Sequence, residues 1–63
     1  MKRVDLIRHL RGHGGVLFRE GGNHSVYLNP VRKKVSAVPR HREVFNAIVF
    51  KICRDLDIPP PHL

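Results

Sequence analysis

The clearest candidate for chemistry in this sequence is a histidine that directly follows a glycine-rich turn. His24 comes after Gly21, Gly22 and Asn23 and begins a segment with apolar residues. Imidazole titrates near neutrality, so such a residue can act as a general base or a general acid. Gly22 has no side chain, which leaves room for a phosphate backbone to approach the histidine. Taken alone, however, a histidine after a Gly-Gly turn is typical of an ordinary surface position, and a hairpin already explains the glycines.

A second candidate feature is a stretch that contains no acidic residue. The chain has twelve Lys and Arg against five Asp and Glu, a net charge of +7, yet no Asp or Glu stands from Gly21 to Arg42. The cations of this stretch are Arg32, Lys33, Lys34, Arg40 and Arg42. They could hold phosphates through charge-assisted hydrogen bonds or form a solvated loop that serves solubility. The lack of interspersed acids favours a phosphate-binding surface, which would include Gly22 and Asn23.

The charge balance also limits the class of partner and the compartment. A net charge of +7 predicts an anionic partner: nucleic acid first, then a membrane surface or an acidic protein. No apolar run approaches the roughly 20 residues that span a bilayer. Met1–Asp5 leads into an amphipathic helix rather than an apolar signal segment, so we expect no export. Cys53 is the only cysteine; it excludes an internal disulfide and a Cys-rich zinc module, and fits the cytoplasm.

The hydrophobic pattern predicts five elements in a single domain over residues 1–63. A helix is expected from Arg3 to about His13, with Gly14-Gly15 as its stop, and a second from Arg42 or Glu43 to about Leu56. Between them we expect three strands: Val16–Glu20, His24–Leu28 and Lys34–Val38. A proline-rich tail follows from about residue 59. The order predicts an α+β fold, αβββα, in which two helices cover one face of a three-stranded antiparallel sheet, as in double-stranded-RNA-binding domains.

Alternation along the second strand predicts how His24 is oriented. Val26 and Leu28 are the natural core residues of this strand, so we expect them to face the helices. Side chains two residues apart share a face, so His24 would point the same way and be accessible only because it lies at the strand's end. Tyr27 would lie on the opposite face, where it could stack on a base or pack on the sheet.

The second helix has one broad apolar face in this interpretation. Val44, Ile48 and Ile52 align along it, and Phe45, Val49, Cys53 and Leu56 widen it. Cys53 is then a buried, inert thiol. Phe50 lies outside this face, where it could be an ordinary exposed residue or a contact with another chain.

Three further histidines are weaker candidates. His9 and His13 are four residues apart on the first helix, a possible metal spacing, but no third ligand is evident nearby, so we predict no metal site. His41 follows Arg40 just before the second helix. It could assist the chemistry or contact a phosphate, although a surface histidine is the expected interpretation.

The segment Arg19–Tyr27 resembles the G-[S/N]-H signature of the HicA toxin family. Three other segments are similar to the same family: Lys2–Ile7, Val38–His41 and Ile52–Ile58. The resemblance runs from about Lys2 to Ile58. It implies an mRNA-cleaving ribonuclease of double-stranded-RNA-binding fold, the toxin of a type II toxin–antitoxin pair, silenced by an acidic HicB-type antitoxin. His24 then stands at the catalytic position. The chain departs from the family at Asn23, where Ser is more usual, and at Phe50, where a polar residue is expected.

The chemistry of RNA gives an independent reason to consider His24. The 2′-hydroxyl of RNA is its own nucleophile, so cleavage needs a base, an acid and cations, but neither a metal nor another cofactor. Two other functions stay open: a non-catalytic RNA-binding module of the same fold, and an inactive toxin-like protein that binds an antitoxin. A histidine at the position that the resemblance implies to be catalytic favours the ribonuclease over these two alternatives. An RNA-binding module is expected to carry more lysine along the second helix, where only Lys51 and Arg54 occur.

Overall fold

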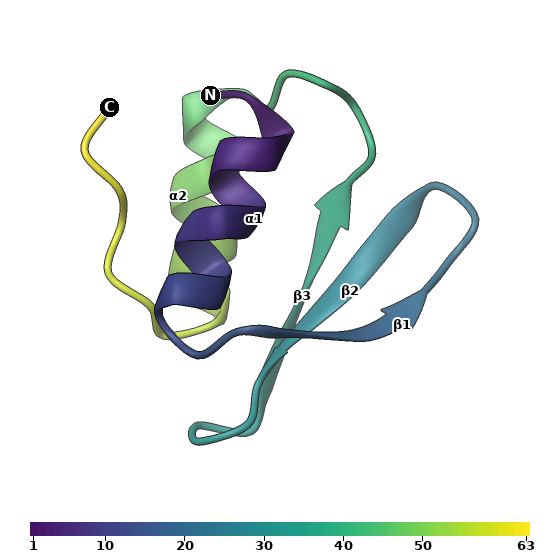
Figure 1. The fold of residues 1–63 in the computed structure, drawn as a ribbon, viewed down its shortest axis with the longest axis vertical. Coiled ribbons are helices and arrows are strands. Elements are labelled where there is room, and N and C mark those ends of the chain that lie inside the picture. Colours follow the sequence, from purple (N-terminus) through teal and green to yellow (C-terminus); the bar gives the residue numbers. More distant parts are fainter.

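The chain folds as two helices and one three-stranded antiparallel sheet, as the sequence predicted. The computed structural model describes all 63 residues. Its elements are α1 (Arg3–Gly12), β1 (Val16–Glu20), β2 (His24–Asn29), β3 (Lys34–Pro39) and α2 (Asn46–Asp55). The strands lie in the order β1-β2-β3, and the helices pack together beside the sheet (Figure 1). The αβββα order and the α+β class are therefore confirmed.

Two glycines just after α1, Gly14 and Gly15, end the helix in a conformation that a side chain would hinder. Gly14 has φ +89°, a left-handed conformation that side chains rarely adopt. At Gly15 an added Cβ would lie 2.9 Å from the Leu10 carbonyl oxygen, to which the Gly15 amide donates a hydrogen bond. This tight end turns the chain directly into β1. Leu6 and Leu10, both fully buried, are the contribution of α1 to the core.

Helix α2 begins at Asn46, later than the predicted start at Arg42 or Glu43. The segment before it is extended and pairs with the start of the chain: the Arg3 amide donates to the Arg42 carbonyl, and the Val44 amide to the Met1 carbonyl. Phe45, the last extended residue, consequently turns outward and is 83% exposed. The predicted inward position of Phe45 is wrong.

The buried face of α2 is narrower than the one predicted. Val49, Ile52, Cys53 and Leu56 are buried and follow the i, i+3, i+4, i+7 spacing of one helical face. Ile48 lies at the edge of this face and is exposed, which contradicts its predicted place in the core. Burial raises the pKa of the Cys53 thiol, in agreement with the predicted inert cysteine.

Strand β2 faces the helices with the side opposite to the one predicted. Ser25, Tyr27 and Asn29 are buried, whereas Val26 and Leu28 are only half-buried and lie on the open face of the sheet. Ser25 and Asn29 can occupy the inner face because each forms a hydrogen bond there: Ser25 accepts from Arg3, and Asn29 donates to the Leu56 carbonyl. Tyr27, expected on the outer face, packs in the hydrophobic core.

Hydrogen bonds from small polar side chains tie the helices to the sheet. The Asn29 amide donates to the Leu56 carbonyl at 2.7 Å, and the Ser36 hydroxyl donates to the Asp55 carboxylate at 3.0 Å. No buried side-chain nitrogen or oxygen lacks a partner. The inner layer is therefore a mixed one, in which the polar groups are satisfied rather than excluded.

The β1–β2 hairpin projects beyond the helices (Figure 1). Every residue of β1 is exposed, and a bulge between Leu17 and Arg19 leaves Phe18 unpaired and 61% exposed.

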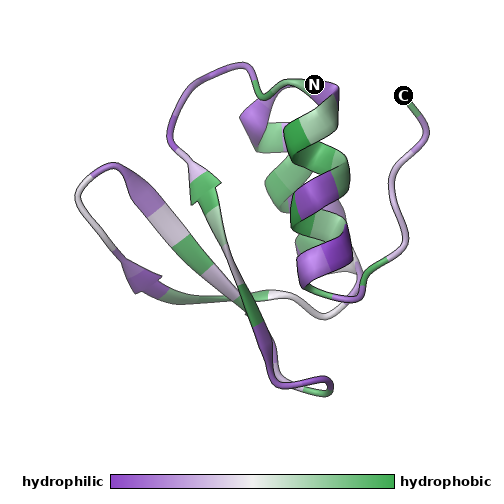
Figure 2. Ribbon diagram, turned by 180° about the vertical axis from the view of Figure 1, so that it is seen from behind, coloured by the Kyte–Doolittle hydropathy of each residue, from purple (hydrophilic) through white to green (hydrophobic).

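Helix α2 is hydrophobic over much of its first half, including the side turned away from α1 (Figure 2). Neither helix has the length and apolar character needed to cross a membrane.

We predict that replacing Asn29 with Ala destabilises the protein by about 1–3 kcal/mol, because the buried Leu56 carbonyl loses its donor. Asn23→Ala, at an exposed position of the hairpin, is the control and should change stability by about 0.5 kcal/mol at most. Thermal or urea unfolding measures both. Equal stability of the two variants would contradict the role of this hydrogen bond.

Candidate catalytic and phosphate-binding site

His24 is exposed at the start of β2, on the face of the sheet away from the helices. Its backbone pairs with Pro39 at the end of β3. The prediction that the His24 side chain is accessible is correct, but the predicted reason is not. The side chain is accessible because it lies on the face of the sheet that the helices leave open, and not because the helices end before they reach it. A hollow of about 620 Å³ surrounds it, lined by Gly22, Asn23, His24, Arg40 and His41.

This hollow brings a second histidine to His24. His41 follows the end of β3, and β3 is paired with β2, so the two imidazoles line one hollow although 17 positions separate them in sequence. We name it the His24–His41 hollow. Two imidazoles allow one group to accept a proton while the other donates one, and the Arg40 guanidinium supplies positive charge. The sequence indicated His41 as a residue that could assist; only the strand pairing shows that it lines the same hollow as His24.

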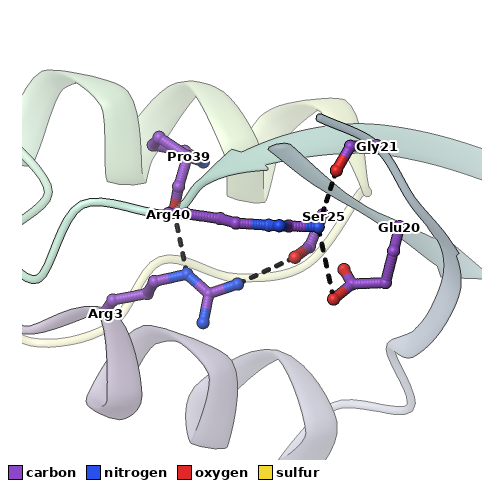
Figure 3. Close-up of polar contacts among 6 residues, drawn as sticks. All are labelled: Arg3, Glu20, Gly21, Ser25, Pro39 and Arg40. Atoms are coloured by element: carbon purple, nitrogen blue, oxygen red, sulfur yellow. Dashed lines mark hydrogen bonds and ion pairs between the residues drawn. The ribbon is translucent and has the colours of Figure 1, made fainter. Parts of the chain in front are cut away.

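Arg40 is fixed by contacts with the β1–β2 hairpin. Its Nη2 atom donates to the Gly21 carbonyl at 2.7 Å and forms an ion pair with Glu20 at 3.4 Å (Figure 3). The Ser25 hydroxyl, followed by the positive charges of Arg40 and Arg3, lowers the pKa of Glu20 below its ordinary value. These contacts join the end of β3 to the turn that precedes His24, so they hold the two sides of the hollow together.

Arg3 fixes the same two strands from the side of the helices. Its Nε donates to the Pro39 carbonyl and its Nη2 to the Ser25 hydroxyl, both at 2.9 Å (Figure 3). Ser25 is the residue after His24, and Pro39 is the residue paired with it. Arg3 is therefore a positioning residue for the histidine. Sequence reasoning missed it because its partners lie 22 and 36 residues away, with no local signal.

A second hollow adjoins the first beside the start of α1. Its volume is about 840 Å³, and its lining residues are Lys2, Arg3, Val4, Ile7, Arg40, Arg42 and Glu43. Arg40 lines both hollows, so they adjoin at this side chain. We name the second one the α1 groove. Of the predicted phosphate-binding residues it contains Arg40 and Arg42, and it adds Lys2, which sequence reasoning did not select.

The remaining predicted cations lie at the other end of the sheet. Arg32, Lys33 and Lys34 belong to the turn between β2 and β3, which closes beside the Asn29–Lys34 pair. Five residue steps along β2 separate that pair from His24, a distance of about 16 Å. Arg32 is also paired with Asp57 at 3.2 Å. The acid-free stretch is thus two separate basic clusters. Of its cations, only Arg40 lines the hollow of His24, and Arg42 lies in the adjoining α1 groove.

The other histidines do not join this site. The ring centroids of His9 and His13 lie 4.6 Å apart with their planes tilted by 55°, and the His9 Nε2 atom lies 2.7 Å from the Pro59 carbonyl oxygen. No group of three or more His, Cys, Asp or Glu side chains is placed to hold a metal ion.

Comparison with known proteins assigns no family to this chain. No family model, no curated protein and no solved structure matches it.

We predict that the ion pair between Glu20 and Arg40 weakens in acid. The pKa of Glu20 is lowered by folding, so its stabilising contribution is complete above the ordinary value of 4.5 and is lost as the pH falls through the lowered folded value. Amide signals of Gly21 to His24, followed by NMR from neutral to acidic pH, should shift in that range in the parent protein. Glu20→Gln should abolish this titration; an unchanged profile in that variant would assign it to another group.

Proposed function

We propose that this protein is a metal-independent endoribonuclease that cleaves mRNA and acts as the toxin of a toxin–antitoxin pair. The observation that carries this proposal is the His24–His41 hollow, in which two titratable rings and the fixed Arg40 guanidinium line one exposed surface. The resemblance of Arg19–Tyr27 to the HicA signature supports the same function. The net charge of +7 suits a polyanionic substrate.

The reaction follows from the chemistry of RNA. One imidazole, as the free base, accepts the proton of a 2′-hydroxyl, and the 2′-oxygen attacks the adjacent phosphorus. The bond from phosphorus to the 5′-oxygen breaks, and the other ring, as imidazolium, donates a proton to that oxygen. The products are a 2′,3′-cyclic phosphate and a 5′-hydroxyl. Arg40 stabilises the negative charge that develops on the phosphoryl oxygens, and Gly22 leaves the phosphate room to approach.

We expect His24→Gln to lower the cleavage rate by about 10²-fold or more, because it removes one proton-transfer group. His41→Gln should cause a loss of the same order, because it removes the second proton-transfer group. Each substitution should remove one limb of a bell-shaped pH–rate profile. His13→Gln, outside the hollow, is the matched control and should leave the rate unchanged. Rates are measured on one purified RNA, with circular dichroism to verify folding.

Three outcomes of this experiment discriminate among the functions. A folded His24→Gln variant that cuts at the parent rate would refute the mechanism. Loss of cleavage in EDTA would indicate a metal-dependent reaction in place of the one proposed. A parent protein that binds RNA but does not cut it would favour the non-catalytic RNA-binding module.

The proposed partner is an acidic antitoxin of the HicB type that covers His24 and the neighbouring cations. Its acidic side chains would complement Arg40, Arg42 and Lys2 and speed association. Exposed apolar side chains such as Phe18, Phe45 and Phe50 are available to slow its release. The proposed location of the pair is the cytoplasm, and neither a membrane nor a small-molecule cofactor is part of the proposal.

We predict that the protein encoded next to this chain binds it tightly and suppresses its inhibition of growth. Co-expression followed by pull-down and a growth assay measures both effects. Arg40→Glu should weaken the complex by reversing a charge at the covered surface, whereas Arg11→Glu, on the exposed part of α1, should not. A neighbouring product that neither binds nor suppresses growth arrest would remove the support for the two-component system.

A further inference from the structure

The α1 groove is basic and lies outside the acid–base chemistry described above. Its four cationic side chains come from two distant segments: Lys2 and Arg3 from the start of the chain, and Arg40 and Arg42 from the segment after β3. Hydrogen bonding between the Arg3 amide and the Arg42 carbonyl, at 2.8 Å, brings these segments together. Glu43 is the single acid of the lining, and its carboxylate is paired with the Met1 amino group at 3.5 Å. Arg40 is paired with Glu20, so the positive excess of the groove comes from Lys2, Arg3 and Arg42.

The cations of this groove keep hydrogen-bond donors that the fold does not use. Lys2 and Arg42 have no intramolecular side-chain partner. Arg3 uses Nε and Nη2 but not Nη1, and Arg40 uses only Nη2. Unused donors on Arg and Lys suit the oxygens of a phosphate group. At about 840 Å³ the groove also falls within the roughly 300–1,000 Å³ of ordinary ligand sites.

The position of the groove indicates which phosphate it could hold. Arg40 lines both hollows, so a strand whose reacting phosphate lies between His24 and His41 continues over Arg40 toward Lys2 and Arg42. Grooves that bind single-stranded nucleic acid follow the backbone in this way, with cations along its path. The cluster at Arg32–Lys34 lies about 16 Å from His24 along β2 and is not continuous with this path.

We propose that the α1 groove binds a phosphate of the nucleotide next to the scissile bond and so guides a single RNA strand into the His24–His41 hollow. The inference rests on the proposed ribonuclease function and adds a subsite to it. Lys2 and Arg42 are the residues that hold the flanking phosphate, while Arg40 lies between the two subsites. A substrate that lacks the flanking phosphate gains nothing from the groove.

Substrate length provides the decisive test. A dinucleoside monophosphate contains only the scissile phosphate, whereas a single-stranded ten-nucleotide RNA also has flanking ones. The double variant Lys2→Ala/Arg42→Ala should lower kcat/KM on the ten-nucleotide RNA by about tenfold or more, through KM, and leave the dinucleotide unaffected. The salt slope of binding to the longer RNA should fall by about two units.

The control variant Arg11→Ala/Arg54→Ala removes the same net charge from exposed helical positions outside both hollows. It should leave the preference for the longer RNA intact. Glu43→Gln should act in the opposite direction and tighten binding of the longer RNA, because it removes the only carboxylate of the groove. Equal losses in the two double variants would show a general charge effect and overturn the subsite.

A second measurement separates failure of the groove from failure of the proposed function. Inorganic phosphate is titrated into the parent protein and into His24→Gln while the amide signals of Lys2, Arg3 and Arg42 are followed by NMR. We expect saturable shifts at these residues in both proteins, and their loss in Lys2→Ala/Arg42→Ala. Absence of these shifts overturns the groove even if RNA is cleaved. Shifts in a protein that cuts no RNA would refute the ribonuclease and retain a phosphate site. If the double variant impairs only binding of the protein partner, the groove belongs to that interface and the subsite is rejected.

Discussion

The guanidinium of Arg3 connects the first turn of α1 to the ends of two strands, and the geometry of the site depends on this connection. Through Pro39 and Ser25 it holds the end of β3 against the start of β2, the two places from which His41 and His24 extend. Arg40 makes the corresponding connection on the hairpin side through Gly21 and Glu20. In a 63-residue chain with a small core, such directional contacts fix positions that apolar packing alone leaves loose.

The polar inner face of β2 and the exposed His24 side chain both follow from which face of the strand is turned toward the helices. A strand has two faces, and here Ser25 and Asn29 take the inner one because Arg3 and the Leu56 carbonyl satisfy them there. Val26 and Leu28 then remain on the open face, where they are half-buried, and His24 emerges on the same side. The cost of leaving two apolar residues partly exposed is offset by hydrogen bonds made away from water.

The distribution of charge follows from the length of the strands. A basic stretch that is continuous in sequence is split by β3 into clusters at opposite ends of the sheet, and the cluster near His24 is completed by Lys2 and Arg3 from the start of the chain. Because electrostatic attraction at a surface falls off within about 8–10 Å at physiological salt, each cluster acts on its own neighbourhood. The proposed chemistry therefore depends on the cations that surround the two hollows and not on the net charge of the chain.

The sequence by itself determined the five elements, their order and the α+β class, because these depend on local signals. The glycines after α1, the Gly-Gly turn before His24 and the prolines at Pro39 and Pro59 each act within a few residues. It also determined that His24 lies at the start of a strand beside a glycine turn. Only the tertiary structure decided which face of β2 is buried, that α2 starts at Asn46, that His41 lines the same hollow as His24, and that Lys2 and Arg3 line the adjoining α1 groove. Those outcomes depend on strand pairing and on hydrogen bonds between residues distant in sequence, and periodicity along one strand or helix carries no information about such partners.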